Sequence, residues 1–356
     1  MKPLKRIAIT AGVVVVVGAV ALVSRTLVMG GMFTEVKPVA LECKTLRGVT
    51  GAEDIAIDRQ GGLAFASATD RRATPDRAST LDGIYVLSLA HPETGFAKLA
   101  GAPKDFHPHG ISLFRAADGT LTLMAVNHLS PTQHAIDIFV VKTANGTVTL
   151  SEVGDIQSDK LLSPNDVAAV GKEQFYVTND HGSHTPFGQT LENYLMLPRA
   201  DVLYFDGSVF KEVATGLVFA NGIALSNDGN RVYVTESTAR RIQTFGRDLF
   251  SGKLTPENTF DLPSGPDNID VDEKGDLWIA AHPKMFALVG YMSDPSKPSP
   301  SEVYRVVVKD GIPQSAARVY ANPGQQIGAA SVGAVAQGHL FIGSIFDPKI
   351  LDCRVP

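Results

Sequence analysis

Polar side chains that could bind a metal recur at one position of a repeated pattern in this chain of 356 residues. Each copy has a polar residue, then a small or polar one, then usually a β-branched one. The copies are Glu53-Asp54-Ile55, His109-Gly110-Ile111, Asn165-Asp166-Val167, Asn221-Gly222-Ile223 and Asp267-Asn268-Ile269, with Val332-Gly333-Ala334 as a degenerate sixth. The first four begin 56 residues apart, at positions 53, 109, 165 and 221. Carboxylate and amide oxygens suit calcium, which takes about six to eight of them, and suit zinc or copper poorly.

These positions predict a calcium site built from oxygen ligands. Its five expected ligands are Glu53, Asn165, Asn221, Asp267 and Asn268. Asp54 and Asp166 come one residue later, and we expect them to hold a second calcium with a backbone carbonyl, because consecutive strand residues point to opposite sides. A single asparagine is typical of a turn. Recurrence at one position favours a metal site instead, since buried carboxylates without a cation are costly.

Two histidines add a possible base. His109 occupies the repeated position, and His128 lies at the far end of the next predicted strand. A pair of histidines can share a proton and activate water near neutral pH. The alternative for either ring alone is a structural role, and the repeated position of His109 favours the catalytic one.

The elements that position these residues are predicted to be short strands. A tight turn followed by an apolar strand recurs six times, over residues 58–65, 118–123, 171–177, 228–234, 274–279 and 337–342. The repeat is roughly 45 to 65 residues long, close to the ~40 to 50 residues expected for a four-stranded propeller blade. The sequence therefore predicts an all-β fold, a six-bladed β-propeller whose repeated polar residues meet in a central calcium-binding tunnel. A linear sandwich could produce the same strands, but recurrence at equal phase favours the closed ring.

One short helix is expected in the longest gap between strand signals, over residues 190–197, where apolar residues recur at helical spacing. It would lie on a loop over one face of the propeller. The sequence leaves open whether it is a packed connector or a lid that contacts substrate or membrane.

The N-terminus resembles a targeting signal, with Lys2, Lys5 and Arg6 before an apolar run over residues 7–23. We expect residues 1–30 to be an uncleaved hydrophobic anchor helix and residues 31–356 to be the propeller domain. The weak site Ala19-Val20-Ala21 leaves a cleaved signal peptide as the alternative. The leading positive charges predict membrane association, with the propeller in an oxidising periplasmic or extracellular compartment. The net charge of −5 gives no indication of nucleic-acid binding.

The two cysteines, Cys43 and Cys353, lie at opposite ends of the predicted propeller. They could be inert buried thiols. Their placement and the expected oxidising compartment favour a disulfide that joins the ends of the ring.

Taken together, these motifs resemble the paraoxonase/arylesterase family over nearly the whole chain after the N-terminal segment. The matching segments are Glu53-Asp54, Phe106–Ser112, Pro164–Asp166, Phe175–His181, Phe219–Ile223, Asp267–Ile269 and Gly275–Trp278, with the terminal cysteine pair. The loop over residues 70–76 departs from the family pattern, because it is charged and lacks an aromatic residue. The resemblance implies hydrolysis of lactones and aryl esters, and often weak hydrolysis of organophosphates.

The resemblance also implies roles for single residues. The five-ligand set would hold a catalytic calcium, and Asp54, Asp166 and the carbonyl of Ile111 would hold a structural one. His109 would be the proton acceptor, with His128 behind it. A rival within the family makes Asp267 the base or nucleophile.

Three other functions remain open from the sequence. One is a gluconolactonase-type hydrolase of sugar lactones, and another is a strictosidine-synthase-like propeller, which would not need the full set of metal ligands. The third is a non-catalytic, calcium-stiffened propeller that binds a partner. The apolar N-terminus favours lipophilic ester or lactone substrates.

Overall fold

The computed structural model describes residues 2–73 and 79–355, and in these residues 24 strands form six four-stranded antiparallel sheets. The first blade has β2 (Ala52–Asp58), β3 (Leu63–Ala68), β4 (Gly83–Ser88) and β5 (Ala97–Lys98), with a short 3₁₀ helix at Pro92–Thr94. The second has β6 (Pro108–Arg115), β7 (Leu121–Ser130), β8 (Gln133–Ala144) and β9 (Thr147–Gln157). The third has β10 (Pro164–Ala169), β11 (Phe175–Asn179), β12 (Ala200–Phe205) and β13 (Phe210–Leu217).

The second half of the chain repeats this pattern. The fourth blade has β14 (Ala220–Leu225), β15 (Arg231–Glu236), β16 (Arg241–Arg247) and β17 (Leu254–Asp261). The fifth has β18 (Gly265–Val271), β19 (Leu277–His282), β20 (Ser301–Lys309) and β21 (Ile312–Asn322). The sixth has β22 (Ala330–Ala336), β23 (His339–Ser344), β24 (Lys349–Arg354) and β1 (Cys43–Arg47).

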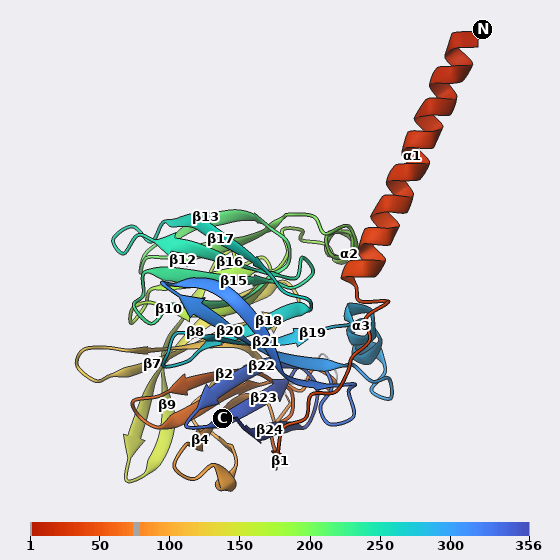
Figure 1. Ribbon diagram of the computed structural model, residues 1–356. Helices are drawn as coiled ribbons and strands as arrows, with labels where there is room; N and C mark the ends of the chain where they lie inside the picture. The colour runs from red at the N-terminus through yellow and green to blue at the C-terminus, as the bar shows by residue number, and fades with distance from the viewer. Residues whose placement is uncertain (1, 74–78, 356) are drawn as a thin grey trace.

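The blades close into a ring, which confirms the predicted six-bladed propeller (Figure 1). Their first strands are neighbours in the order β2, β6, β10, β14, β18 and β22, and β22 lies beside β2 again. All six predicted turns connect the first strand of a blade to its second strand. The repeated polar motif therefore lies on the six innermost strands, facing a common axis.

Apolar side chains hold the blades together. Six clusters of buried hydrophobic residues each join two adjacent blades. Phe65 of the first blade packs with Phe139 of the second, for example, and Tyr176 of the third packs with Val232 of the fourth. Burial of such faces is the main favourable contribution to folding. This interlocked packing gives the inner strands a rigid frame.

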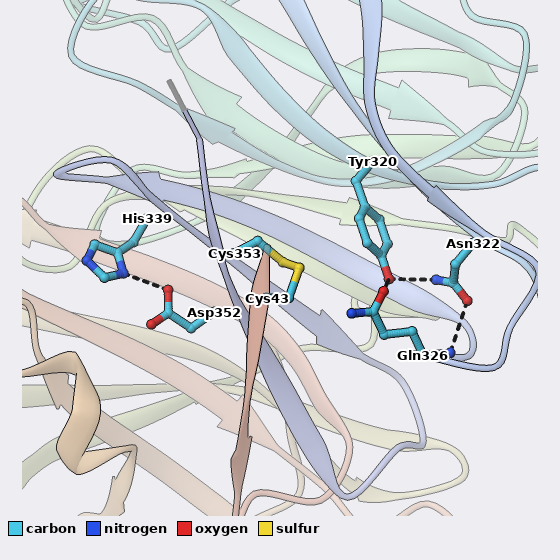
Figure 2. Close-up of a disulfide and its surroundings, with 7 residues drawn as sticks. All are labelled: Cys43, Tyr320, Asn322, Gln326, His339, Asp352 and Cys353. Carbon is cyan, nitrogen blue, oxygen red and sulfur yellow. Dashed lines mark hydrogen bonds and ion pairs between the residues drawn. A yellow bond between two sulfur atoms is a disulfide. The ribbon is translucent and has the colours of Figure 1, made fainter. Parts of the chain in front are cut away.

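The sixth blade is assembled from both ends of the chain. β1 pairs antiparallel with β24, and Cys43 lies opposite Cys353 in the register. The two cysteines form a disulfide across a sequence separation of 310 residues, as predicted (Figure 2). Beside it, His339 Nδ1 lies 2.6 Å from Asp352 Oδ1. The ring is thus closed by backbone pairing and by a covalent bond.

Three α-helices lie outside the blades in the described residues: α1 (Lys2–Met29), α2 (Pro186–Leu195) and α3 (Met285–Ser293). α1 projects away from the propeller (Figure 1). α2 and α3 lie near the end of α1 that is closest to the propeller. The hydroxyl of Thr26 in α1 donates to the carbonyl of Tyr194 in α2 at 2.8 Å. In the part of the chain that the structure describes, no helix is long and apolar enough to cross a membrane. The predicted membrane anchor is not confirmed.

α2 confirms the predicted short helix but begins four residues before the expected start. Thr185 caps it by accepting a hydrogen bond from the backbone of Gly188, and Pro186 occupies its first turn. α3 was not predicted, because its sequence is apolar with no amphipathic spacing and therefore gives no helical period.

Candidate metal centre and active site

Every innermost strand departs from regular pairing at the repeated motif. The register shifts fall between Ala52 and Asp54, Pro108 and Ile111, Pro164 and Val167, Ala220 and Ile223, Pro266 and Ile269, and Ala330 and Val332. A bulge of this kind leaves residues unpaired and re-aims their side chains. We expected from the sequence that consecutive side chains would point to opposite sides of the strand. That strict alternation therefore does not apply at these positions.

The register also corrects the sixth copy of the motif. Ser331, rather than Val332, occupies the unpaired position that Glu53 has in the first blade. Its hydroxyl donates to the backbone carbonyl of Glu53 at 2.6 Å. The sequence expectation was wrong by one residue, because serine did not fit the acidic or amide pattern. The sixth blade thus supplies a support for Glu53.

Glycine is required at two of the six motifs because neighbouring strands approach closely. A Cβ atom at Gly110 would lie 2.3 Å from Asp166 Oδ1, and one at Gly222 would lie 2.6 Å from the carbonyl oxygen of Asp267. Any side chain at these positions would push the adjacent inner strand away. The glycines therefore let the polar residues of successive blades come together.

The five predicted ligands of the catalytic site form what we call the acceptor cluster. Its members are Glu53, Asn165, Asn221, Asp267 and Asn268, and at most 5% of each is exposed. Each amide nitrogen of the cluster donates a hydrogen bond. Asn268 Nδ2 donates to Glu53 Oε1 at 2.8 Å, Asn165 Nδ2 donates to an Asp180 oxygen at 3.2 Å, and Asn221 Nδ2 donates to Ser237 Oγ at 3.0 Å. These bonds fix which way each amide oxygen faces.

Four buried oxygens of the acceptor cluster have no hydrogen-bond partner among the described residues. These buried atoms are Glu53 Oε2, Asn165 Oδ1, Asn221 Oδ1 and Asn268 Oδ1. Leaving a buried acceptor unsatisfied costs about 1–3 kcal/mol, so four of them in one cluster need an explanation. An oxygen-seeking cation such as calcium would satisfy all four. In the described residues, no set of three or more His, Cys, Asp or Glu side chains is placed to hold a metal, so the amide oxygens are essential to this fit.

The charges of the acceptor cluster are mutually dependent. Burial raises the pKa of Asp267, although His282 opposes the shift. Burial also acts to raise the pKa of Glu53, but the neighbouring His109 outweighs it and the pKa of that carboxyl is lowered. Buried carboxylates side by side favour a bound cation, which offsets their repulsion and desolvation.

Asp54 and Asp166, which we call the aspartate pair, are bound in a different way. Asp54 accepts backbone hydrogen bonds from Ile55 at 2.7 Å and Ile111 at 2.8 Å. Asp166 accepts the equivalent bonds from Val167 at 2.7 Å and Ile223 at 2.8 Å. Each carboxylate thus ties its own strand to the next blade.

The aspartate pair still carries the electrostatic signature of a shared site. Burial raises the pKa of Asp54 well above its usual range, and the charge of Glu53 raises it further. Burial likewise raises the pKa of Asp166 well above its usual range, and the charge of Asp54 raises it further. Both residues and Ile111 line a cavity of about 220 Å³ at this end of the tunnel. A cation here would stabilise the ionised form of both groups.

The predicted histidine pair is in hydrogen-bond contact. His109 Nδ1 lies 2.8 Å from His128 Nε2, and the other nitrogen of His109 lies 3.5 Å from Glu53 Oε1. His109 therefore connects the acceptor cluster to His128. Burial lowers the pKa of His128 well below its usual range, with a further contribution from His109, so this ring is neutral at pH 7.

Sequence reasoning missed three further residues around the site. His282 Nε2 lies 2.7 Å from Asp267 Oδ2, His181 Nδ1 lies 2.6 Å from Asp180 Oδ1, and His134 Nδ1 lies 2.9 Å from His128 Nδ1. His282 closes the second strand of its blade, and His181 lies two residues beyond the end of such a strand. The signal that could have found these two is a polar residue at or just beyond the end of the second strand of a blade, as at Asn179.

The mouth of the site is lined by charges of both signs and by histidine. A pocket of about 430 Å³ is lined by Asp70, Arg71, Asp82, His107 and His128, among others. Burial lowers the pKa of Arg71, and the nearby carboxylates of Glu53, Asp82 and Asp267 oppose the shift. Arg72 turns the other way and stacks on the rings of Tyr291 and Phe346, at 4.7 and 4.5 Å from their centres. Residues 74–76 of the loop that departs from the family pattern lie outside the described residues.

Comparison with known proteins agrees with this architecture. A family model described as arylesterase matches residues 35–355. The chain is 34% identical to human serum paraoxonase/arylesterase 1 over 335 residues, which cover 90% of this chain and 91% of that protein. It is also 34% identical to serum paraoxonase/arylesterase 2 of Gallus gallus, with the same coverage of both chains. A solved structure of regucalcin, a calcium-binding protein of Agrobacterium tumefaciens, is 15% identical and shares the fold, with a TM-score of 0.51 over 90% of this chain and 95% of that one.

Proposed function

This chain belongs to the arylesterase family of ester hydrolases, and we propose that it hydrolyses lactones and aryl esters with the help of calcium. The observation that carries the proposal is the set of four buried oxygens in the acceptor cluster that lack partners among the described residues. Partner binding alone would not need four such acceptors beside a histidine pair. The assignment of lactones and aryl esters as substrates rests on the similarity in sequence to the paraoxonase relatives.

The acceptor cluster would hold the catalytic calcium through side-chain oxygens of Glu53, Asn165, Asn221, Asp267 and Asn268. Calcium bound there would polarise the carbonyl of the substrate and stabilise the oxyanion that forms on it. Asp54, Asp166 and the carbonyl of Ile111 would hold a second, structural calcium. The regucalcin relative, which its description calls calcium-binding, lends this assignment only the likeness of its fold.

The histidine pair would supply the base. His109 Nε2 faces Glu53 and would take a proton from the attacking water, while Nδ1 stays bonded to His128. His128 is buried and neutral, so it can accept or donate in this bond without adding charge. The water oxygen then attacks the carbonyl carbon, the acyl–oxygen bond breaks, and the departing alkoxide receives a proton.

The rival assignment makes Asp267 the base or nucleophile. One oxygen of Asp267 is already bonded to His282 at 2.7 Å, which restrains it as a metal ligand would be restrained. We therefore favour His109. His109→Gln is expected to lower kcat by about 10²- to 10⁴-fold. Activity near that of the unmodified protein would instead favour Asp267.

We further propose that residues 31–356 act as the hydrolase domain and that residues 1–30 form a separate segment. The disulfide and the serum relatives fit an extracytoplasmic location for the domain. Weak organophosphate hydrolysis is a third activity to be measured alongside the two ester classes. The charged mouth at Arg71 is expected to decide among these substrates.

The test measures hydrolysis of a long-chain acyl homoserine lactone and of phenyl acetate, with and without a calcium chelator. Activity that chelation abolishes and added calcium restores supports the proposal, with thermal melting used to confirm that the protein stays folded. Activity that chelation leaves intact in protein shown to be calcium-free contradicts the calcium assignment. No turnover of either substrate by folded, calcium-loaded protein contradicts the hydrolase assignment and favours a binding platform.

A further inference from the structure

Three histidine rings form a hydrogen-bonded row that leads away from the acceptor cluster. His109 Nδ1 lies 2.8 Å from His128 Nε2, and His128 Nδ1 lies 2.9 Å from His134 Nδ1. The rings lie edge to face, with centres 5.0 Å and 4.9 Å apart. Both contacts are short enough for a shared proton. The base of the proposed reaction is therefore the inner end of a chain of three rings.

The fold places the third ring by strand register. His128 is the last residue of β7 before its register with β8 shifts, and His134 lies directly opposite it on β8. The two strands are joined by a tight hairpin that contains Pro131. Facing pairs in an antiparallel sheet have close side chains, so the contact follows from the backbone. Only 8% of His134 is exposed, so the ring is held rather than free in solvent.

The row has two neutral arrangements that differ by the transfer of protons along it. In one, His109 donates from Nδ1 to His128, His128 donates from Nδ1 to His134, and His109 Nε2 carries no proton. In the other, every bond is reversed and His109 Nε2 carries the proton. The first arrangement presents a free base beside Glu53, where the attacking water would lie. His134 therefore helps to decide whether His109 can act.

The outer end of the row reaches open space. His134 lines two pockets of about 500 and 430 Å³, and Pro131 of the β7–β8 hairpin also lines both. Each is many times the volume of a water molecule, about 30 Å³ in the liquid. Burial lowers the pKa of His134, and the charge of Asp180 opposes the shift. A proton on His134 would thus be readily lost to the solvent in these pockets.

We propose that His134 is the outer end of a proton path and acts as a positioning residue for the histidine pair. The inference rests on the proposed hydrolase function. His109 Nε2 takes a proton from water as the oxygen attacks, the Nδ1 proton of His109 passes to His128 Nε2, and the Nδ1 proton of His128 passes to His134 Nδ1. The excess proton then resides on His134, where it exchanges with solvent. The reverse transfers return a proton to the departing alkoxide, so that the rings regain their starting arrangement and no proton is gained or lost.

The path is tested with His134→Gln, because the glutamine oxygen can accept from His128 but cannot carry a proton onward. In weak buffer, we expect kcat to fall about 10- to 100-fold with little change in KM. Added imidazole is expected to restore most of kcat, since a small base in the adjoining pockets can take over the exchange. Unmodified protein should not respond to imidazole. His91→Gln is the matched control, because its ring is exposed and remote from the row, and it should behave as the unmodified protein does.

Two outcomes would overturn the path. In the first, His134→Gln keeps kcat within twofold of the unmodified protein. In the second, kcat falls but does not respond to imidazole, which means that His134 only supports the packing of His128. If His134→Gln fails to fold, His134→Asn is measured in the same way.

His109→Gln separates this inference from the proposed function. An inactive His109→Gln with a fully active His134→Gln contradicts the path and leaves the base in place. An active His109→Gln contradicts the base, and the path with it.

Discussion

The acceptor cluster and the aspartate pair occupy neighbouring positions on the same strands but satisfy their oxygens in opposite ways. Each carboxylate of the aspartate pair accepts two backbone N–H groups from adjacent strands. The acceptor cluster uses its amide groups to fix its orientation and leaves four oxygens without partners among the described residues. Unpartnered acceptors are retained where a ligand will use them. The backbone bonds of the aspartate pair tie adjacent strands together, and each carboxylate oxygen keeps a lone pair for the proposed structural calcium. The difference separates residues expected to matter for activity from residues expected to matter for stability.

The largest expected effect comes from the acceptor cluster. Asn221→Ala removes one unpartnered oxygen and breaks only one side-chain bond, to Ser237. We expect kcat/KM to fall about 10²- to 10³-fold, because one group that holds the catalytic cation is lost. Calcium affinity, measured by competition with a chromophoric chelator, should fall as well. Asn230→Ala, in an exposed turn, is the control. Unchanged calcium affinity in Asn221→Ala would contradict the role that we give to the acceptor cluster.

A smaller effect on activity, but a larger one on stability, is expected from the aspartate pair. Asp166→Ala leaves the backbone N–H groups of Val167 and Ile223 without their acceptor. The free energy of unfolding should fall by about 2 to 6 kcal/mol, since each buried unsatisfied donor costs about 1–3 kcal/mol. Urea unfolding in the presence of a chelator measures the free energy of unfolding without a contribution from bound calcium.

Two comparisons sharpen that measurement. Asn221→Ala should lose about 1 kcal/mol under the same conditions, because it breaks a single hydrogen bond. Asp159→Ala, at an exposed position, should lose almost nothing. Equal losses for Asp166→Ala and Asn221→Ala would mean that the two groups do not differ in the way we describe.

The smallest expected effect separates burial from metal binding. Asp137 is a buried carboxylate outside both groups, and burial raises its pKa to about 7 while the bond from Asn127 opposes the shift. Its pKa is higher in the folded state than in the unfolded state, so the folded state binds more protons and stability falls as the pH rises from about 4 to about 7. Asp137→Asn should flatten this dependence in urea unfolding measured across that range. A slope that the substitution leaves unchanged would assign the pH dependence to the tunnel carboxylates.

The strand pattern could be predicted from the sequence because turns and alternating side chains are local signals. All six turns, the closing disulfide and the contact of His109 with His128 agree with the prediction. The bulges could not be predicted, because a register shift depends on which residues of two strands face each other. For the same reason, the sequence placed the sixth motif at Val332 rather than at Ser331.

Two of the histidines that the sequence analysis missed, His134 and His282, share one cause. His134 meets His128 through the register of a hairpin, and His282 meets Asp267 through the pairing of β18 with β19. Neither pair has a fixed spacing that a motif could reveal. The roles of the ligands remain predictions, because residue types can indicate an oxygen-rich site without fixing which ions it holds.

The closing disulfide also changes what a break in the backbone would do. Residues 43–353 form a covalent ring, since the two sulfurs join the ends of that segment. A protease that cuts once in any loop of this ring opens it to a linear chain but releases no fragment. The helix α1 lies outside the ring, so a cut before residue 43 separates it from an intact propeller. Under reducing conditions the same single cut inside the ring would yield two pieces held together only by blade packing.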